Sequence, residues 1–168
     1  FPKFFHTDPT VDRKSGFLMP AFGESKNLGA SVNIPYFYAI SDSQDLTFKP
    51  RFFSNDEFLL QSEYRKVNKN SSHILDLSFN KTNSDSEKGR NTHFFSNSKF
   101  DLGDTLFSES SIELKIEKVS NDDYISLYSL EGTSPIIKDT SVLENLIEFS
   151  GSQNDFYLDM SFESYETM

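Results

Sequence analysis

The sequence contains no cysteine and no tryptophan among its 168 residues. Without cysteine, the chain forms neither a disulfide nor a thiolate metal site. No apolar run approaches the roughly 20 residues that a membrane-spanning helix requires. Basic residues are also few, with 16 against 26 acidic ones and a formal net charge of −10. This acidic excess disfavours nucleic acid as a partner, because proteins that bind nucleic acid present a basic face.

The chain does not begin with methionine. It starts in mid-pattern with "FPKFF" and stops at "ESYETM", directly after an alternating run. We therefore expect a piece of a longer protein.

Aromatic residues are abundant in a chain that is polar overall. The sequence holds 18 Phe and 7 Tyr, which bring the aromatic share to 15%, while the mean hydropathy is −0.51. A helical bundle would need more Leu and Ala. A sheet with one apolar face and one polar face accounts for both values.

The dominant pattern is an alternation of apolar and polar residues with a period of two, which predicts half-buried strands. Turn residues separate the alternating runs, and we predict roughly nine antiparallel strands of about 8 to 12 residues, arranged as a meander. The connection 81–90 is longer and more polar than the others. The least regular segment is 121–143, where we expect a long loop with a short strand or helix. The clearest alternating runs are 32–40, 46–53, 73–80, 111–118 and 155–163.

Two architectures produce this alternation. Strands of this length match the roughly 9–11 residues that cross a bilayer at a tilt, with the apolar face turned outward. A soluble β-sandwich has the same period with the apolar face turned inward. Periodicity alone places the sandwich somewhat ahead. The strongly aromatic apolar faces, and hairpins that follow one another without a Greek-key crossover, favour the barrel.

No catalytic or metal-binding pattern is present. The three histidines, His6, His73 and His93, lack the spacing of metal ligands, and we interpret them as strand or surface residues. The acidic pair Asp122 and Asp123 falls in a loop, where solvated charge is the simplest interpretation. We therefore expect no enzyme activity, no metal and no cofactor.

Two neighbouring predicted strands carry an internal proline. Pro20 lies in "RKSGFLMPAFG" and Pro35 in "SVNIPYFYAI". Proline cannot donate to a sheet ladder, and it belongs at edges or bulges. A basic cluster, 12–16, precedes the first of these strands. It is either a solvated turn or a basic rim that contacts anionic headgroups.

These residues resemble a known family. The pieces "DRKSGFLMPAFG", "IPYFYAIS" and "DLTFKPRF" occur in order within 6–54, and this stretch is similar to the start of the barrel domain of the lipopolysaccharide-assembly outer-membrane proteins, the LptD family. The resemblance implies a fragment of a large transmembrane β-barrel that is not closed. It assigns 1–14 to the end of a link from a periplasmic domain and 15–168 to the N-terminal part of the barrel.

The resemblance also implies a function. In this family, lipopolysaccharide passes into the outer leaflet of the outer membrane of Gram-negative bacteria through a lateral gate between the first and last strands. Pro20 and Pro35 would weaken that gate, whereas Pro50 is interpreted as structural. The implied partners are lipopolysaccharide, a plug lipoprotein of the LptE type, a periplasmic bridge protein of the LptA type and the outer membrane. Residues expected at the gate or at the lipid interface are Arg13, Lys14, Phe17, Leu18, Phe22, Tyr36 and Tyr38.

Because lipopolysaccharide is anionic, we expect the acidic residues to lie in loops and in the lumen, away from the lipid path. Two alternatives remain: another outer-membrane barrel, such as a porin or receptor, and a soluble carbohydrate-binding β-sandwich.

Overall fold

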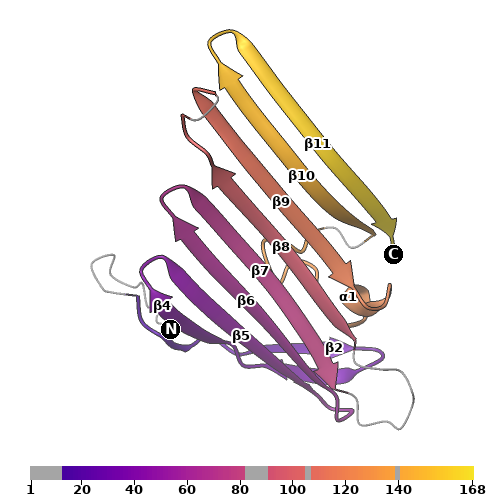
Figure 1. Cartoon of the computed structure of the whole chain (residues 1–168). Helices are drawn as coiled ribbons and strands as arrows, with labels where there is room; N and C mark the ends of the chain where they lie inside the picture. The colour runs from indigo at the N-terminus through magenta and orange to yellow at the C-terminus, as the bar shows by residue number, and fades with distance from the viewer. Residues whose placement is uncertain (1–12, 82–90, 105–106, 139–140) are drawn as a thin grey trace, which may run out of the picture.

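The computed structural model describes residues 13–81, 91–104, 107–138 and 141–168. The described residues form one open antiparallel sheet of 11 strands, in the order β1-β4-β5-β6-β7-β8-β9-β10-β11, with β2 and β3 beside its first edge (Figure 1). Most of the predicted link 1–14, and the connection 81–90 apart from Lys81, lie outside the described residues. The prediction of an all-β meander that is not closed is confirmed.

Seven long strands form most of the sheet, and each pairs with its neighbour in the chain. Their alternating side chains place apolar and polar residues on opposite faces, as the sequence predicts. The strands are β5 (Gln44–Phe53), β6 (Phe58–Asn68), β7 (Ser71–Lys81), β8 (Thr92–Asp101), β9 (Glu109–Val119), β10 (Val142–Gln153) and β11 (Phe156–Thr167).

The first two passes of the chain are each split in two. The first pass consists of β1 (Gly16–Phe17) and β2 (Ala21–Ser25), and the second of β3 (Gly29–Asn33) and β4 (Tyr36–Ser41). With these splits, the nine predicted passes become 11 strands. Figure 1 shows the β2–β3 arm crossing the lower end of the sheet, at an angle to the long strands.

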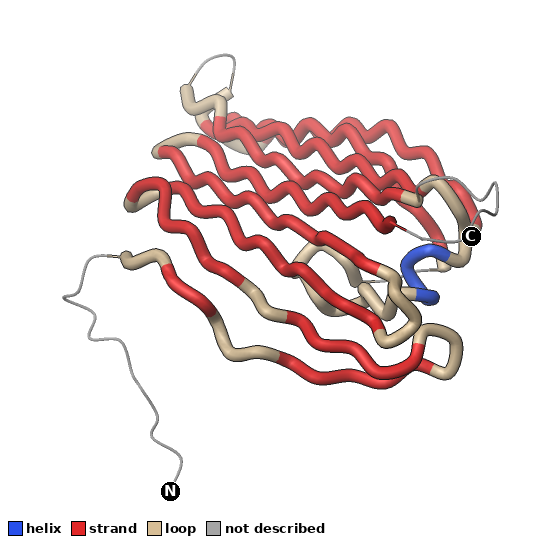
Figure 2. Tube along the Cα trace, turned by 90° about the horizontal axis from the view of Figure 1, so that it is seen from below, coloured by secondary structure: helices blue, strands red, loops and turns tan. Residues whose placement is uncertain are grey.

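Residues 120–138, here called the inserted segment, fold back onto one face of the sheet (Figure 2). They contain α1 (Tyr124–Leu127), a single turn of helix. We call the covered face the inner face and the opposite one the outer face. The prediction of a long irregular connection with a short helix in 121–143 is confirmed, although β10 already begins at Val142.

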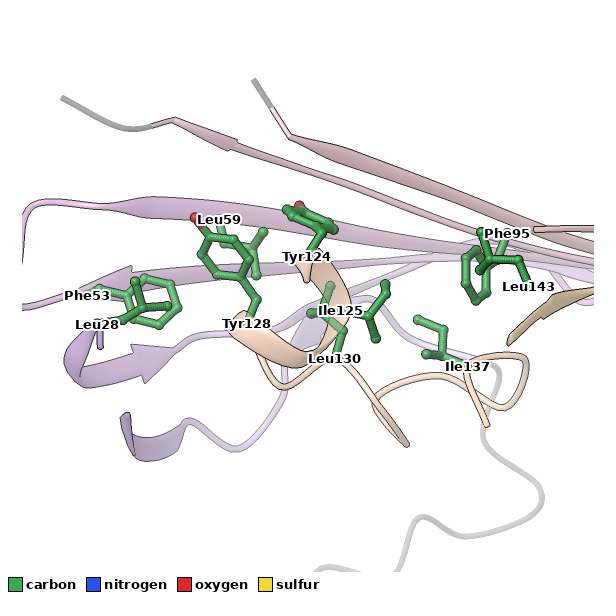
Figure 3. Packing of buried hydrophobic residues seen from close by; sticks show 10 residues of the cluster. All are labelled: Leu28, Phe53, Leu59, Phe95, Tyr124, Ile125, Tyr128, Leu130, Ile137 and Leu143. Carbon is green, nitrogen blue, oxygen red and sulfur yellow. The ribbon is translucent and has the colours of Figure 1, made fainter. Parts of the chain in front are cut away.

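The apolar core lies between the inserted segment and the inner face. Figure 3 shows Tyr124 and Tyr128 side by side near Leu59 of the wall. The turn of the β2–β3 arm also reaches this core, through a buried Leu28. The cluster consists of Leu28, Phe53, Leu59, Phe95, Tyr124, Ile125, Tyr128, Leu130, Ile137 and Leu143.

The outer face carries large apolar side chains that stay exposed. The strand register aligns them in rows across the sheet. Among the described residues, charged side chains occur on this face only near strand ends, such as Lys81 and Lys118. Exposed members are Phe22, Tyr38, Phe48, Phe52, Leu77, Phe79, Phe94, Ile116, Ile147, Phe156, Met160 and Phe162.

The inner face is the polar one. Its buried residues include Asp45, Thr47, Gln61, Glu63, Asp76, Ser78, Asn80, His93 and Glu117. A soluble sandwich would bury its apolar face and expose the polar one. The observed arrangement is the reverse, so the sandwich interpretation does not describe this fold. In the described part of the chain, no helix has the length and apolar character needed to cross a membrane.

Candidate functional site

The prolines lie together at the first edge of the sheet, where they interrupt the hydrogen-bond ladder. The Leu18 amide donates to the Pro35 carbonyl at 2.8 Å, and the Ile34 amide donates to the Pro50 carbonyl at 3.1 Å. Hydrogen-bonded pairs in antiparallel strands normally exchange two bonds. Pro35 and Pro50 have no N–H, so both return bonds are missing. Each loss removes roughly 0.5–1.5 kcal/mol of net pairing.

Pro20 lies at an irregularity between the first two passes. Phe17 pairs with Tyr36, and the next pair joins Ala21 to Asn33. Three residues of the first pass, 18–20, therefore face only two of the second. This extra residue, followed by the bend of the arm, is the geometry of a β-bulge.

The structure brings together only some of the predicted gate and interface residues. Phe17 packs edge-on against Tyr36, with ring centroids 5.0 Å apart. Leu18 is 46% exposed and Tyr38 is 47% exposed. Phe22, which is 84% exposed, lies apart from the others on the β2–β3 arm. Their roles at a gate or lipid interface stay predictions.

The two basic residues expected at the rim differ in their surroundings. Lys14 is exposed. Arg13 turns toward the inner face, where its guanidinium binds the Asp45 carboxylate at 2.5 Å and lies 5.5 Å from the centre of the Phe37 ring. Arg13 is therefore occupied by protein contacts in this arrangement.

Four buried carboxylates on the inner face all have partners. Asp45 binds Arg13 and Arg65, and Glu63 binds Lys49 at 3.2 Å. Near the other edge, the buried Glu117 binds Lys115 at 2.9 Å, and Lys115 also binds Glu144 at 2.6 Å. The fourth buried carboxylate is that of Asp76, whose partners are His93 and Gln61. Buried charges need such partners, because an unpaired one costs several kcal/mol. These acidic residues lie on the polar inner face.

A chain of hydrogen bonds joins the inserted segment to the wall. His93 Nε2 donates to Asp76 at 2.7 Å, and Ser78 Oγ lies 2.6 Å from His93 Nδ1. The Tyr124 hydroxyl lies 2.8 Å from Ser78 Oγ. The carboxylate can only accept, so His93 donates to Asp76 through Nε2. In the neutral tautomer His93 Nδ1 then accepts from Ser78, and Ser78 accepts from Tyr124. Gln61 Nε2 adds contacts to both Asp76 oxygens, at 3.0 and 3.1 Å.

Ser78, His93 and Asp76 contain the residue types of a hydrolase triad. A working triad needs a serine that a substrate can reach, beside donors for an oxyanion. Ser78 is 2% exposed and its hydroxyl is in contact with Tyr124. A substrate has no access to this serine while the segment is in place, so the geometry supports anchoring rather than catalysis.

The second anchor is Tyr128. Its hydroxyl donates to Glu57 at 2.7 Å and accepts from Asn80 at 2.7 Å, while Arg51 donates to its carbonyl at 2.6 Å. Burial, together with the Glu57 carboxylate, raises the pKa of Tyr128. Burial likewise raises the pKa of Tyr124 to about 12. Both hydroxyls therefore stay protonated over the physiological range.

A third anchor lies at Thr133. Lys49 Nζ donates to its carbonyl at 2.6 Å, and Gln61 donates to its side-chain oxygen at 2.9 Å. The inserted segment thus spans the inner face from β5 to β8 through polar contacts as well as apolar packing.

An aromatic group covers the outer face at the opposite end of the sheet from the inserted segment. Phe107 packs 5.8 Å from Phe149 and stacks 6.3 Å from Phe156. Gly151 makes room for it, since a Cβ there would lie 2.9 Å from the Phe107 ring. Aromatic residues at this level are typical of the interfacial girdles of membrane barrels.

Sequence reasoning missed several of these residues. His93 lies in a strand, as interpreted, but it is fully buried in a polar network. The signal was available: His93 and Asp76 fall on polar positions of alternating runs, and Tyr124 and Tyr128 are spaced as neighbours on one helical turn. Asp122 and Asp123 are exposed, as expected. His6 lies outside the described residues, and within them no group of His, Asp or Glu could hold a metal ion.

Comparisons with known proteins give the relationship of the chain. The family model described as "LptD protein" matches residues 1–113. LPS-assembly protein LptD of Ralstonia nicotianae is 35% identical over 79 residues, covering 47% of this chain and 10% of that protein. LPS-assembly protein LptD of Nitrosococcus oceani is 28% identical over 158 residues, covering 93% of this chain and 20% of that protein. The chain therefore spans a fifth or less of these relatives, and by its sequence match it belongs to the LptD protein family.

Proposed function

We propose that this chain is part of the wall of an outer-membrane β-barrel that inserts lipopolysaccharide into the outer leaflet. The observation that carries the proposal is the orientation of the two faces. The exposed outer face is apolar, with charge near the strand ends, as a lipid-facing wall requires. The inner face is polar and charged, as a lumen requires.

Turn lengths support an orientation in the membrane. The described two-residue turns, at 42–43, 69–70 and 154–155, all lie at the end of the sheet where β1 begins, whereas described turns at the opposite end are longer, such as 26–28 and 54–57. The inserted segment belongs to the opposite end. Outer-membrane barrels have short periplasmic turns and longer extracellular loops. The chain thus enters from the periplasm, and the inserted segment is an extracellular loop that folds into the lumen.

The lateral gate is the finer part of the proposal. A closed barrel has no edges, so an exit for a lipid requires one weak line in the wall. Pro20, Pro35 and Pro50 lie close together at the first edge of the sheet. Pro35 and Pro50 each remove one backbone hydrogen bond from a pair of neighbouring strands. The return bonds lost at Pro35 and Pro50 sum to roughly 1–3 kcal/mol. The weakened pairs lie between the first three passes, so the first pass could swing away from the wall and open the seam that it would form with the last strand of the barrel.

The partners follow from the same proposal. Lipopolysaccharide would arrive from a periplasmic bridge protein of the LptA type, and a plug lipoprotein of the LptE type would occupy the remaining lumen. No chemical step is assigned to this chain, since transport needs a path and an energy source but no bond-making residue. A porin or receptor is the second candidate, although neither function requires a weakened edge.

The test replaces both gate prolines in the full-length protein. The variant Pro20→Val with Pro35→Val restores two amide donors, and lipopolysaccharide at the cell surface is then measured by labelling. We expect delivery to fall, because the edge pairs more firmly. The control is Pro135→Val, which changes an exposed proline of the inserted segment outside any ladder. Undiminished delivery in the double variant would contradict the gate.

A further inference from the structure

Few backbone hydrogen bonds hold β1 and the residues beside it to the rest of the sheet. β1 contains two residues, and its pairs are Gly16 with Phe37 and Phe17 with Tyr36. One further backbone bond joins the Leu18 amide to the Pro35 carbonyl. A two-residue strand is marginal on its own. Other contacts must therefore hold this part of the chain in place.

Arg13 supplies most of those contacts. Its Nη2 binds Asp45 at 2.5 Å, its Nη1 donates to the Asp42 carbonyl at 3.1 Å, and its guanidinium lies 5.5 Å from the centre of the Phe37 ring. Ser15 contributes one more bond by accepting from the Ala39 amide at 3.0 Å. The side chains of Asp45 and Arg13 are 4% and 40% exposed, so only the arginine end of the pair is open to solvent.

Asp45 is held a second time, from the other side. Arg65 on β6 donates its Nε to Asp45 at 2.8 Å. If Arg13 moved away, the buried carboxylate would keep a charged partner. The usual large cost of breaking a buried ion pair comes from the charge left alone, and Arg65 prevents that. The Arg13 contact is therefore reversible at low cost, while the Arg65 contact belongs to the fixed wall.

We propose that Arg13 and Asp45 form a latch that positions the incoming chain against the first hairpin, and that this latch must release when the seam opens. The inference rests on the proposed function, because it assigns a positioning role within the same gate. Arg13 is the moving half, since it lies on the weakly paired pass. Asp45 is the fixed half, since Arg65 and the β5–β6 ladder hold it.

The test compares two neighbouring basic residues in the full-length protein. Arg13→Ala removes the latch, and Lys14→Ala removes the same charge from an exposed side chain one residue later. Hydrogen exchange of the Leu18 and Ala39 amides reports pairing of the first pass directly. We expect exchange about three- to tenfold faster in Arg13→Ala, in line with a partly exposed charged pair. Lys14→Ala should match the wild type, and Arg13→Lys should lie between the two.

A second readout separates the latch from the gate. A looser seam should admit a large antibiotic that an intact outer membrane excludes, so Arg13→Ala cells should become more sensitive than Lys14→Ala cells. Equal exchange of Leu18 in the two variants would overturn the latch and leave the gate proposal untouched. Faster exchange with unchanged antibiotic sensitivity would overturn the coupling of the latch to the seam. The proline experiment tests the gate itself, whatever the outcome here.

Discussion

Replacement of His93 by Ala should release the inserted segment from the wall. His93 is 2% exposed and connects Asp76 to Ser78, and through Ser78 to Tyr124. Without the imidazole, Asp76 stays buried and keeps the side-chain amide of Gln61, which donates to both of its carboxylate oxygens. Removing one partner of such a pair costs about 3–5 kcal/mol. Because 1.4 kcal/mol corresponds to about a factor of ten, the opening equilibrium should rise by about two to three and a half powers of ten.

Hydrogen exchange of the peptide 124–130 in the full-length protein measures that opening. Its amides include Tyr128, which bonds to the Tyr124 carbonyl at 3.2 Å. The control is His73→Ala, which removes a histidine of the same sheet from the outer face, where it contacts Ser98 and Ser71. His93→Gln should recover part of the protection, since an amide can still donate to Asp76. Unchanged exchange in His93→Ala would refute the anchoring role of the network.

Two further outcomes are expected, one at Tyr124 in the inserted segment and one at Gly151 beneath Phe107. Since burial raises the pKa of Tyr124 to about 12, docking of the segment should be intact below the ordinary tyrosine pKa and weaken as pH rises toward 12, by up to about 2–3 kcal/mol. Exchange of 124–130 at about pH 9 and about pH 11 should show this loss, and Tyr124→Phe should remove the part that tyrosine ionisation causes. Gly151→Ala should displace Phe107, whose ring lies 2.9 Å from the added Cβ, and cost about 1–3 kcal/mol. The measurement is the temperature at which the band of the folded protein disappears on gels of heated samples. A lower temperature than in the wild type would reveal that cost, and an unchanged temperature would contradict it.

The strands were predictable because their evidence is local. Alternation along runs such as 73–80 and 155–163 identifies two faces without any long-range information. The direction of the apolar face was not predictable from period alone, since a sandwich and a barrel wall alternate identically. The structure distinguishes the two through the exposed apolar face and through the packing of the inserted segment on the polar face, where Tyr124 contacts Ser78 of β7 and His93 of β8.

The gate region also combines features that the sequence predicts with features that only the structure shows. Pro20 and Pro35 were identified from the sequence as weak points of two neighbouring strands. Pro50 is interpreted from the sequence as structural because it lies further from the seam. Its bond with Ile34 depends on the register between passes, which the sequence does not give. The partner of Arg13 was likewise unpredictable, since 32 positions separate it from Asp45 in the chain.

The most direct measurement of the central claim compares the surroundings of two adjacent residues of β10. Ile147 lies on the outer face and is 54% exposed, and Glu148 lies on the inner face opposite Glu113. A nitroxide label is placed at each position in turn in the full-length protein in bilayers. We predict that the label at Ile147 collides with dissolved oxygen more than with a water-soluble nickel complex, and that the label at Glu148 shows the opposite preference. A water-like label at Ile147, or a reversal between the two positions, would contradict the account.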